Sequence, residues 1–346
     1  MMKAKENSKI LITGGAGFIG SQFGLELTKK GLKKDEEVIL LDNLSFGHLD
    51  NLFSEGSTFG TFICKDIRDT DLNQTFQNVD TIFHFAGISA LPVCQSNPGH
   101  AIDVNVAGTA NVLEAARLSG VRRVIFSSTS ATYELSEEIP MTENLVVGQN
   151  LIYSLSKAQG EQICRAYADN FGMDIIVCRF FNIYGPHQDF HRKSPPFTSY
   201  IARELAYDRQ PILFNNSDVQ RDYVHISDVI ELLLKMIASE KTYRADIFNV
   251  ASGHGHSVPE IYKTMQEVSG KNIAPLFMDP IKYWDAYPSL FAGTFPMNHE
   301  RIKKEVFKHS IGDVKKTSTE FGWTPKINLQ SGLVSIYQYA QNQIRR

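Results

Sequence analysis

The sequence lacks most of the features that mark secreted, membrane-spanning and nucleic-acid-binding proteins. Its 346 residues include only four cysteines, without CxxC or metal-ligand spacing, which favours reduced thiols over disulfides. No apolar run approaches the length that a bilayer requires, and the net charge of −3 comes with no basic stripe for nucleic acid. The polar stretch 1–8 lacks the apolar region of a signal peptide. We therefore expect a cytoplasmic protein with no metal centre, no membrane contact and no nucleic-acid partner.

What the sequence does contain is the composition of an ordinary globular protein. It is 42% hydrophobic and 21% charged, and it shows no internal repeat or low-complexity segment. The length suits one large domain or two fused domains.

A glycine-rich stretch near the N-terminus organises the rest of the chain. Residues 10–12 form a short apolar run that predicts a buried parallel strand. Gly14 and a GxGxxG motif at 15–20 follow at once, and an amphipathic pattern from Phe18 onward predicts a helix. Such glycines permit a tight strand-to-helix turn, close approach of the backbone to a pyrophosphate, and close packing of the helix. The helix N-terminus would offer N–H groups and partial positive charge to that pyrophosphate.

Glycine-rich turns also occur in proteins that bind no ligand there. The next predicted strand favours a dinucleotide-binding turn. Residues 37–42 are apolar and end in Asp42, about 22 residues after Gly20. This is the spacing expected of an acid that binds the adenosine ribose hydroxyls. Because an acid there repels a 2′-phosphate, we expect NAD rather than NADP.

Strands alternate with helices through the first half of the chain. The pattern predicts further strands at 58–65, 79–86, 123–127 and 174–179, and helices at about 99–119 and 153–171. This alternation predicts an α/β, Rossmann-like, doubly wound parallel sheet with helices on both faces. In such sheets the ligand lies across the carboxyl ends of the strands.

The second half of the chain is irregular and rich in proline and aromatic residues. Residues 248–250 suggest one more strand, residues after about 255 suggest helices and loops, and a final helix is expected from Leu329. We expect an NAD-binding domain over 1–180 with return segments near 215–252. Residues 181–346 would mainly form a smaller, interleaved C-terminal substrate-binding domain.

A second chemical signal is the pair Tyr153 and Lys157. Residues four apart on a helix share a face. A phenol is a poor base at neutral pH, because its ordinary pKa is near 10. A nearby ammonium and a positively charged nicotinamide ring would favour the phenolate. The same spacing also recurs by chance on ordinary amphipathic helices.

The strand predicted at 123–127 is followed by further hydroxyl residues. Thr129 stands 24 residues before Tyr153 and could hydrogen-bond a substrate oxygen. Serine and threonine at such places also often serve only to cap or bridge the backbone.

Taken together, these features resemble the extended short-chain dehydrogenase/reductase superfamily, in its nucleotide-sugar epimerase/dehydratase branch, and above all UDP-sugar 4-epimerases. The resemblance covers almost the whole chain. It rests on TGGAGFIGS at 13–21, LLDNLSFG at 40–47, KDIRD at 65–69, HFAG at 84–87, NVAGT at 105–109, SST at 127–129, YSLSK at 153–157, RFFNIYGP at 179–186, RDYVHISD at 221–228, FNVASG at 248–253 and FGWTP at 321–325.

The resemblance implies a role for each matching residue. Thr129, Tyr153 and Lys157 would be the catalytic residues, and Ser89, Thr129, Asn182 and Arg221 would bind the substrate. The expected NAD-binding residues are Gly14, Gly17, Phe18, Ile19, Gly20, Asp42, Asn43, Asp66, Ile67, Phe85, Ala86, Gly87, Asn105, Ser127, Tyr153, Lys157 and Phe180. A guanidinium such as that of Arg221 suits a substrate diphosphate, because it can donate to two phosphate oxygens at once.

The sequence departs from the branch in three places. Ser130 and Ala131 stand where dehydratases and sugar-acid decarboxylases of the branch carry acids. The glycine-rich loop usual before the Arg-Asp-Tyr motif is replaced by residues 215–220. The late Arg-Pro-Gly-Asp segment is absent, and residues 283–311 occupy its region.

The expected function is therefore that of an NAD-dependent nucleotide-sugar epimerase acting at C4 of a UDP-sugar through a transient 4-keto intermediate. Open alternatives are a 4,6-dehydratase, a net dehydrogenase or reductase, a heptose epimerase, a catalytically silent NAD-binding regulator, and an interaction protein. Apolar residues lie on more than one face of the helices near 99–119 and 153–171, and in this branch the matching helices form an intersubunit bundle. We therefore also expect a homodimer.

Overall fold

The computed structural model describes residues 9–189, 192 and 195–344, which form two compact units. Within the described residues, the first unit comprises 9–132, 149–179 and 234–248, and the second comprises the other segments.

The bounds differ from the expected ones in two respects. The segment that returns to the first unit is 234–248, and residues 133–148 belong to the second unit. The cause lies in the contacts of this segment. Tyr133 and Met141 pack with Phe181 and Ala251 in one small core, and the Met141 N–H donates to the Ile311 carbonyl at 2.8 Å.

The central feature of the first unit is a seven-stranded sheet. Its strand order is β12-β8-β7-β6-β1-β2-β5, and the pairings of β1 with β2 and β6, β2 with β5, and β6 with β7 are parallel. The order runs outward from β1 in both directions, which is the doubly wound pattern that the sequence predicted. The strands are β1 Lys9–Thr13, β2 Val38–Asp42, β5 Thr61–Cys64, β6 Val79–His84, β7 Arg123–Thr129, β8 Asp174–Phe180 and β12 Arg244–Val250.

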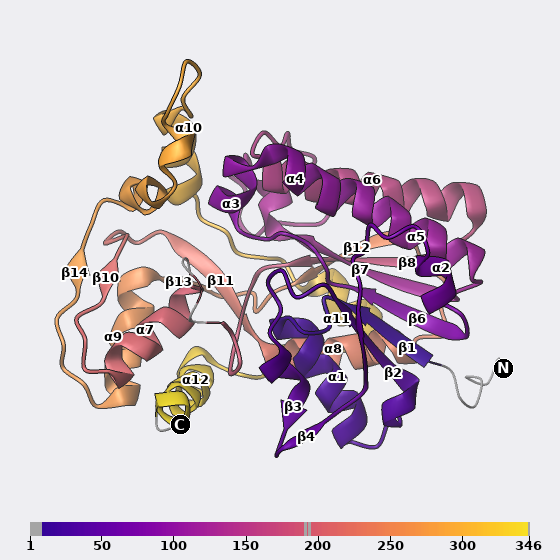
Figure 1. Ribbon diagram of the computed structural model, residues 1–346. Helices are drawn as coiled ribbons and strands as arrows, with labels where there is room; N and C mark the ends of the chain where they lie inside the picture. Colours follow the sequence, from indigo (N-terminus) through magenta and orange to yellow (C-terminus); the bar gives the residue numbers. More distant parts are fainter. Residues whose placement is uncertain (1–8, 190–191, 193–194, 345–346) are drawn as a thin grey trace. The chain divides into compact units, whose positions relative to one another are not determined.

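Helices cover both faces of this sheet, and its strands are correspondingly apolar. Figure 1 shows α4, α5 and α6 on one side of the sheet and α1 on the other. The core contains Leu11, Ile82, Val112 and Val177, all with less than 1% of their surface exposed. The helices are α1 Phe18–Lys29, α2 Leu72–Thr75, α3 Leu91–Ser96, α4 Pro98–Ile102, α5 Gly108–Leu118 and α6 Ile152–Phe171.

Two predicted elements of the first unit are interrupted. The helix expected at 99–119 consists of α4 and α5 with a π-helical turn between them, η3 Asp103–Ala107. Such turns are often found at functional sites. The strand expected at 58–65 is only β5 Thr61–Cys64, because Ser57–Thr58 pairs instead as β4 with β3 Phe53–Ser54 in a short hairpin. Short 3₁₀ segments lie at η1 Asp35–Glu37 and η2 Leu49–Leu52.

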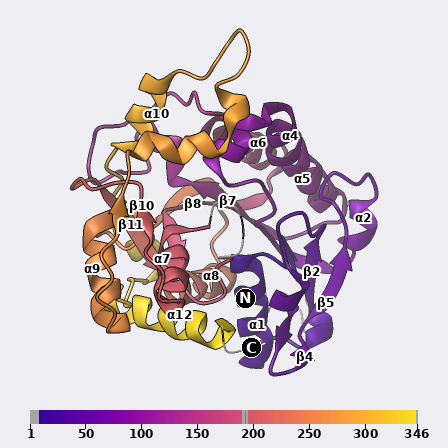
Figure 2. The same ribbon diagram turned by 60° about the vertical axis from the view of Figure 1, so that its left-hand side comes forward.

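The second unit has a separate apolar core between three helices and a small sheet. Figure 2 shows α12 Leu329–Ile344 beside α7 Phe197–Ala206 and α9 Val258–Ser269, and Ile201, Met265 and Leu333 meet between them. The sheet has the order β13-β11-β9, formed by Gly255–Ser257, Gln220–His225 and Asn182–Tyr184. The remaining elements of the second unit are β10 Ile212–Leu213, β14 Leu276–Phe277, α10 His299–Val306, α11 Lys315–Phe321, η5 Pro280–Ala286 and η6 Pro288–Leu290. Two elements include residues of both units, namely η4 Ser130–Tyr133 and α8 Ile226–Ala238.

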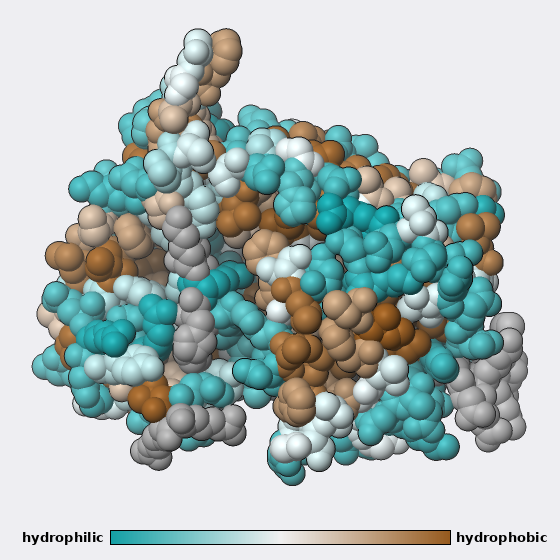
Figure 3. Space-filling view, viewed as in Figure 1, coloured by the Kyte–Doolittle hydropathy of each residue, from teal (hydrophilic) through white to brown (hydrophobic). Residues whose placement is uncertain are grey.

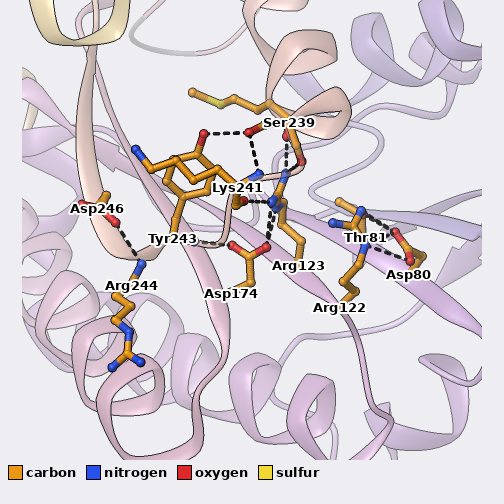
Figure 4. A network of polar contacts seen from close by, with 11 residues as sticks. Asp80, Thr81, Arg122, Arg123, Asp174, Ser239, Lys241, Tyr243, Arg244 and Asp246 are labelled. Atoms are coloured by element: carbon orange, nitrogen blue, oxygen red, sulfur yellow. Dashed lines mark hydrogen bonds and ion pairs between the residues drawn. The ribbon is translucent and has the colours of Figure 1, made fainter. Parts of the chain in front are cut away.

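A buried arginine fastens the amino ends of two central strands. Arg123 begins β7, is 1% exposed, and donates to Asp174 at the start of β8 at 2.8 Å (Figure 4). It also donates to the carbonyls of Met236, Ser239 and Lys241, which follow one another at and after the end of α8. These bonds satisfy carbonyl groups that a helix end leaves without partners.

The surface in the view of Figure 3 is mostly polar, with apolar side chains gathered over the region where η2 and β3 lie. Leu49 in η2 and Phe53 in β3 are each at least 50% exposed, as is Phe46 in the loop before η2. Within the described part of the chain, no helix combines the length and apolar character needed to cross a membrane.

Candidate active site

The glycine-rich turn leaves no room for side chains. Gly14 has a φ of +71°, and a Cβ added to it would lie 2.8 Å from the Ala86 backbone nitrogen. A Cβ on Gly20 would overlap the Gly14 carbonyl oxygen, so the helix can pack this closely only because residue 20 is glycine. The turn is closed by a hydrogen bond from the Gly17 N–H to the Gly14 carbonyl at 3.0 Å.

The N-terminus of α1 is open toward a ligand. Gly17 is its N-cap, no side chain of the described residues caps it, and its first turn contains no acid. Phe18 and Ile19 are the first two helical residues, so their N–H groups belong to the set that a helix leaves without intrahelical partners. This arrangement can bind a pyrophosphate.

Asp42, at the end of β2, is tied to the turn. Its carboxylate accepts hydrogen bonds from the Ala16 N–H at 3.1 Å and the Leu44 N–H at 2.8 Å. Burial raises its pKa above the usual value, while these two bonds oppose the change. The acid that the sequence predicted for ribose binding therefore also fixes the backbone of the glycine-rich turn.

A second acid, Asp66, is linked to the residue that follows Asp42. Asn43 donates to the Asp66 carboxylate at 2.7 Å, and Arg68 donates to both oxygens of the same carboxylate. The hydrogen bond from Arg68 holds the pKa of Asp66 well below its usual range. Ile67 between them is 5% exposed and packs where a Cβ of Gly108 would otherwise stand.

The end of β6 lies next to the end of β1. The Phe85 N–H donates to the Thr13 carbonyl at 3.1 Å and the Ala86 N–H to the Thr13 hydroxyl at 3.2 Å. Gly87 and Ser89, which follow, are exposed. A Cβ on Gly87 would lie 3.8 Å from the Lys157 Nζ. The first unit thus brings the expected lysine to the carboxyl edge of the sheet.

Thr129, Tyr153 and Lys157 belong to β7 and the first turns of α6. The Thr129 hydroxyl hydrogen-bonds the Tyr153 phenol. The Lys157 Nζ lies 4.7 Å from the centre of the Phe126 ring, and the residue is 6% exposed. Burial lowers the pKa of Lys157 to about 8.

In the chain without NAD, burial disfavours the phenolate form of Tyr153. Burial raises the pKa of this phenol to about 12, and the hydrogen bond from Thr129 only partly opposes the change. Sequence spacing placed the phenol and the ammonium on one helix face, but it could not show that packing removes both from water.

A buried network of hydrogen bonds around Glu161 ties the end of β7 to α6. Ser128, next to Thr129, donates to the Glu161 carboxylate, which also accepts from Arg179 at 2.9 and 2.6 Å. Glu161 lies on α6, one turn after Lys157. Ser127, expected near NAD, is 9% exposed.

Asn105 lies in the π-helical turn and is 1% exposed. Its Oδ1 accepts from the Ile88 N–H at 2.8 Å, and its Nδ2 donates at 3.0 Å both to the Ile88 carbonyl and to the Ser156 hydroxyl. The side chain is therefore engaged by the protein, which indicates that it positions the loop after β6 against α6.

Three of the predicted site residues belong to the second unit. Phe180 is 7% exposed, and Asn182 donates to the Asp222 carbonyl at 2.9 Å. Arg221 donates through Nη2 to the Glu305 carbonyl at 2.6 Å. Its Nη1 is buried and has no hydrogen-bond partner among the described residues, which is unusual for a buried polar group.

Sequence reasoning missed four charged residues around Arg221. Glu134 pairs with Arg301 at 3.0 Å, and the Glu305 carboxylate lies 4.0 Å from Arg221. Lys308 is close enough for its charge to act on Glu305, and burial lowers the pKa of Lys308 to about 8. Three of these four come from the departing segment 283–311, whose unusual basic composition was the available signal. No group of three His, Cys, Asp or Glu side chains within the described residues could hold a metal ion.

The comparisons with known proteins agree with this geometry. A model of the family described as "NAD dependent epimerase/dehydratase family" matches residues 10–251. A protein of Methanocaldococcus jannaschii described as a putative UDP-glucose 4-epimerase is 29% identical over 339 residues, which cover 97% of this chain and 99% of that protein.

Two solved structures are similar over nearly their whole length. The UDP-glucose 4-epimerase from Thermotoga maritima with UDP-glucose has a TM-score of 0.83 and 27% identity, and the match covers 97% of this chain and 99% of that one. The UDP-glucose 4-epimerase of Thermus thermophilus in complex with NAD has a TM-score of 0.79 and 28% identity, with coverage of 96% and 99%.

Proposed function

Because the chain belongs to the NAD dependent epimerase/dehydratase family, we propose that it is an NAD-dependent epimerase that inverts C4 of a UDP-sugar. The observation that carries the proposal is the arrangement of Thr129, Tyr153 and Lys157 at the carboxyl edge of the sheet that also bears the glycine-rich turn. Solved relatives with this fold contain NAD or UDP-glucose.

The residues of the first unit suit NAD. The side-chain-free turn at Gly14 and Gly17 and the open N-terminus of α1 would hold the pyrophosphate. Asp42 and Asn43 would face the adenosine ribose, and Asp66 and Ile67 the adenine. An acid at residue 42 disfavours a 2′-phosphate, so NAD should bind more tightly than NADP, which calorimetry with both cofactors can measure.

The chemistry requires a base and an orienting hydroxyl. Thr129 would hold the C4 oxygen of the sugar while Tyr153 takes the proton of the C4 hydroxyl and later returns it. Bound NAD accepts a hydride and gives it back, and its positive nicotinamide ring favours the phenolate. Lys157, one turn along α6, would add a second positive charge that favours the phenolate. Inversion requires that the keto-sugar present its other face before the hydride returns.

Arg221 is the proposed ligand of the substrate diphosphate, with Asn182 beside it. The buried Nη1 without a described partner supports this role, since a phosphate oxygen would supply the missing acceptor. Ser130 and Ala131 provide no acid next to Thr129, which favours epimerisation over dehydration.

We further propose a homodimer in the cytoplasm. Leu118 at the end of α5 and Phe171 at the end of α6 are 59% and 56% exposed, so apolar surface remains on this helix pair. The four cysteines are free, as the reducing cytoplasm would keep them. Light scattering that shows a monomer at micromolar concentration would exclude the dimer.

The substitution Tyr153→Phe tests the proposed function. It removes one oxygen and keeps the ring, so the fold and NAD binding should persist, while turnover of UDP-glucose should fall by about 10²–10⁴-fold or more. Thr129→Val should cost less, because it removes an orienting hydrogen bond rather than the base. Wild-type inactivity toward a panel of UDP-, GDP-, ADP- and dTDP-sugars, read by NMR, would overturn the assignment. Near-normal turnover of Tyr153→Phe would displace Tyr153 as the base.

A further inference from the structure

A fully buried histidine that the proposed mechanism does not use lies behind the site. His84 is the last residue of β6 and has less than 1% of its surface exposed. Its Nδ1 lies 2.7 Å from the Thr13 hydroxyl at the end of β1, and its Nε2 lies 3.1 Å from the Thr109 hydroxyl on α5. Both threonines are at most 1% exposed.

The neighbouring bonds fix the direction of each hydrogen bond. Thr109 uses its single hydroxyl proton to donate to the Asn105 carbonyl at 2.7 Å, so it accepts from the histidine Nε2–H. Because a neutral imidazole then has an acceptor at Nδ1, the Thr13 hydroxyl donates to it. Thr13 in turn accepts from the Ala86 N–H at 3.2 Å. One directed chain therefore runs from Ala86 through Thr13, His84 and Thr109 to Asn105.

The two ends of this chain are parts of the proposed site. Ala86 lies against Gly14 at the edge expected to hold the pyrophosphate. At the other end, the Asn105 side chain donates to the Ser156 hydroxyl, and Ser156 donates to the Tyr153 carbonyl at 2.8 Å. The chain thus connects the cofactor edge with the first turn of α6.

A protonated histidine could not serve in this chain, because both ring nitrogens would donate and Thr13 would lose its acceptor. Burial, with a smaller contribution from the charge of Lys157, lowers the pKa of His84 to about 3, so the ring stays neutral over the working range. The Phe126 ring, which contacts the Lys157 ammonium, also lies 5.7 Å from the imidazole.

We propose that His84, as the neutral Nε2–H tautomer, is a positioning residue that sets the distance between the cofactor edge at Ala86 and the helix turn bearing Tyr153. The role rests on the proposed function, because it presumes that NAD and the sugar meet between these two elements. A displacement of about 1 Å between reacting groups is enough to cost roughly 100-fold in rate.

The first test compares Thr109→Val, which interrupts this series of hydrogen bonds, with Thr109→Ser, which keeps the hydroxyl. We expect kcat for UDP-glucose to fall roughly 10- to 100-fold in Thr109→Val, with KM within about threefold, and to recover largely in Thr109→Ser. Thr81→Val is the matched control. Thr81 is also 1% exposed, but its hydroxyl donates to the Asp80 carboxylate and takes no part in the hydrogen bonds of His84. Its kcat, measured per folded molecule, should equal that of the wild type.

The second test needs no activity. Nitrogen-15 NMR of the imidazole should show a proton on Nε2 and no titration of His84 between about pH 5 and 8. A proton on Nδ1, or titration in this range, would overturn the proposal even if a variant failed to fold.

The outcomes separate the two claims. If the wild type is inactive on every UDP-sugar but shows the Nε2–H tautomer, the proposed function fails and the hydrogen-bond assignment stands. If the wild type is active and Thr109→Val turns over as fast as Thr81→Val, the positioning role fails and the proposed function stands.

Discussion

Arg123 in the first unit and Arg221 in the second are both largely buried, yet they are held in opposite ways. Every guanidinium nitrogen of Arg123 donates to an acceptor, one a carboxylate and the others carbonyls (Figure 4). Arg221 has one hydrogen bond from Nη2 to a carbonyl, a carboxylate 4.0 Å away, and a buried Nη1 without a described partner.

The difference indicates two kinds of buried charge. A guanidinium whose donors are all satisfied by the chain stabilises the fold and has nothing left for a ligand. The unused buried donor of Arg221 lowers the stability of the free protein, and a bound anion would supply the missing acceptor. The contrast supports the proposal that Arg123 stabilises the fold and that Arg221 binds the substrate anion, and each role can be tested by substitution.

The largest effect is expected from Arg123→Met. It leaves Asp174 buried without its cation and three carbonyls without donors, so the free energy of unfolding should fall by about 3–5 kcal/mol. Denaturant unfolding measures the loss. Activity per folded molecule should be unchanged, and a stable variant with impaired turnover would reverse the assignment of Arg123.

Lys157 is a third buried cation, and its substitution should raise stability. Its pKa is lowered from 10.5 to about 8, so the folded protein binds this proton less well than the unfolded chain does. The penalty is complete below pH 8 and disappears as the pH rises from 8 to 10.5. Lys157→Met should therefore be more stable than the wild type by roughly 3 kcal/mol at pH 7, and inactive.

The stability difference between Lys157→Met and the wild type should shrink between pH 8 and 10.5. Unfolding at several pH values measures it. A difference that stays constant over this range would show that burial does not disfavour the ammonium.

The substitution Arg221→Met should weaken UDP-sugar binding about 10- to 100-fold, since a hydrogen bond to a charged group contributes roughly 1.5–3 kcal/mol. NAD affinity should not change, and the free protein should be no less stable than the wild type. Calorimetric titration with UDP-glucose and with NAD gives both values. Unaltered UDP-sugar affinity would mean that the substrate anion binds elsewhere.

The smallest effect is expected from Glu305→Gln. The substitution keeps the backbone carbonyl that Arg221 uses and removes a negative charge beside the proposed diphosphate site. UDP-sugar binding should tighten by a few-fold at most. The matched change at the other arginine, Asp174→Asn, should instead destabilise the fold, and weaker UDP-sugar binding by Glu305→Gln would contradict the proposed position of the anion.

Local sequence patterns predicted the doubly wound parallel sheet, because alternating apolar strands and amphipathic helices leave few ways to build such a fold. The glycine-rich turn, the end of β7 and the start of α6 followed from short motifs. The π-helical turn at 103–107 did not, because it depends on the contacts of Asn105 with Ile88 and Ser156 rather than on local preference.

The electrostatics of the site could not be predicted from the sequence either. The pKa of Tyr153 depends on how completely packing excludes water from the phenol, and the residues around Arg221 come from stretches that are distant in sequence. Glu134 and Arg301 are 167 positions apart, and no spacing rule relates them. Their pairing follows from the second unit, which contains both residues 133–148 and residues 249–344.

The central claim is that hydrogen leaves C4 of the sugar and returns to the same carbon. The most direct measurement uses UDP-glucose carrying deuterium at C4, incubated with the wild-type protein in ordinary water and followed by NMR and NADH absorbance. We expect UDP-galactose that retains deuterium at C4, with no accumulation of NADH. Product with solvent hydrogen at C4, or NADH that accumulates in step with product, would contradict it.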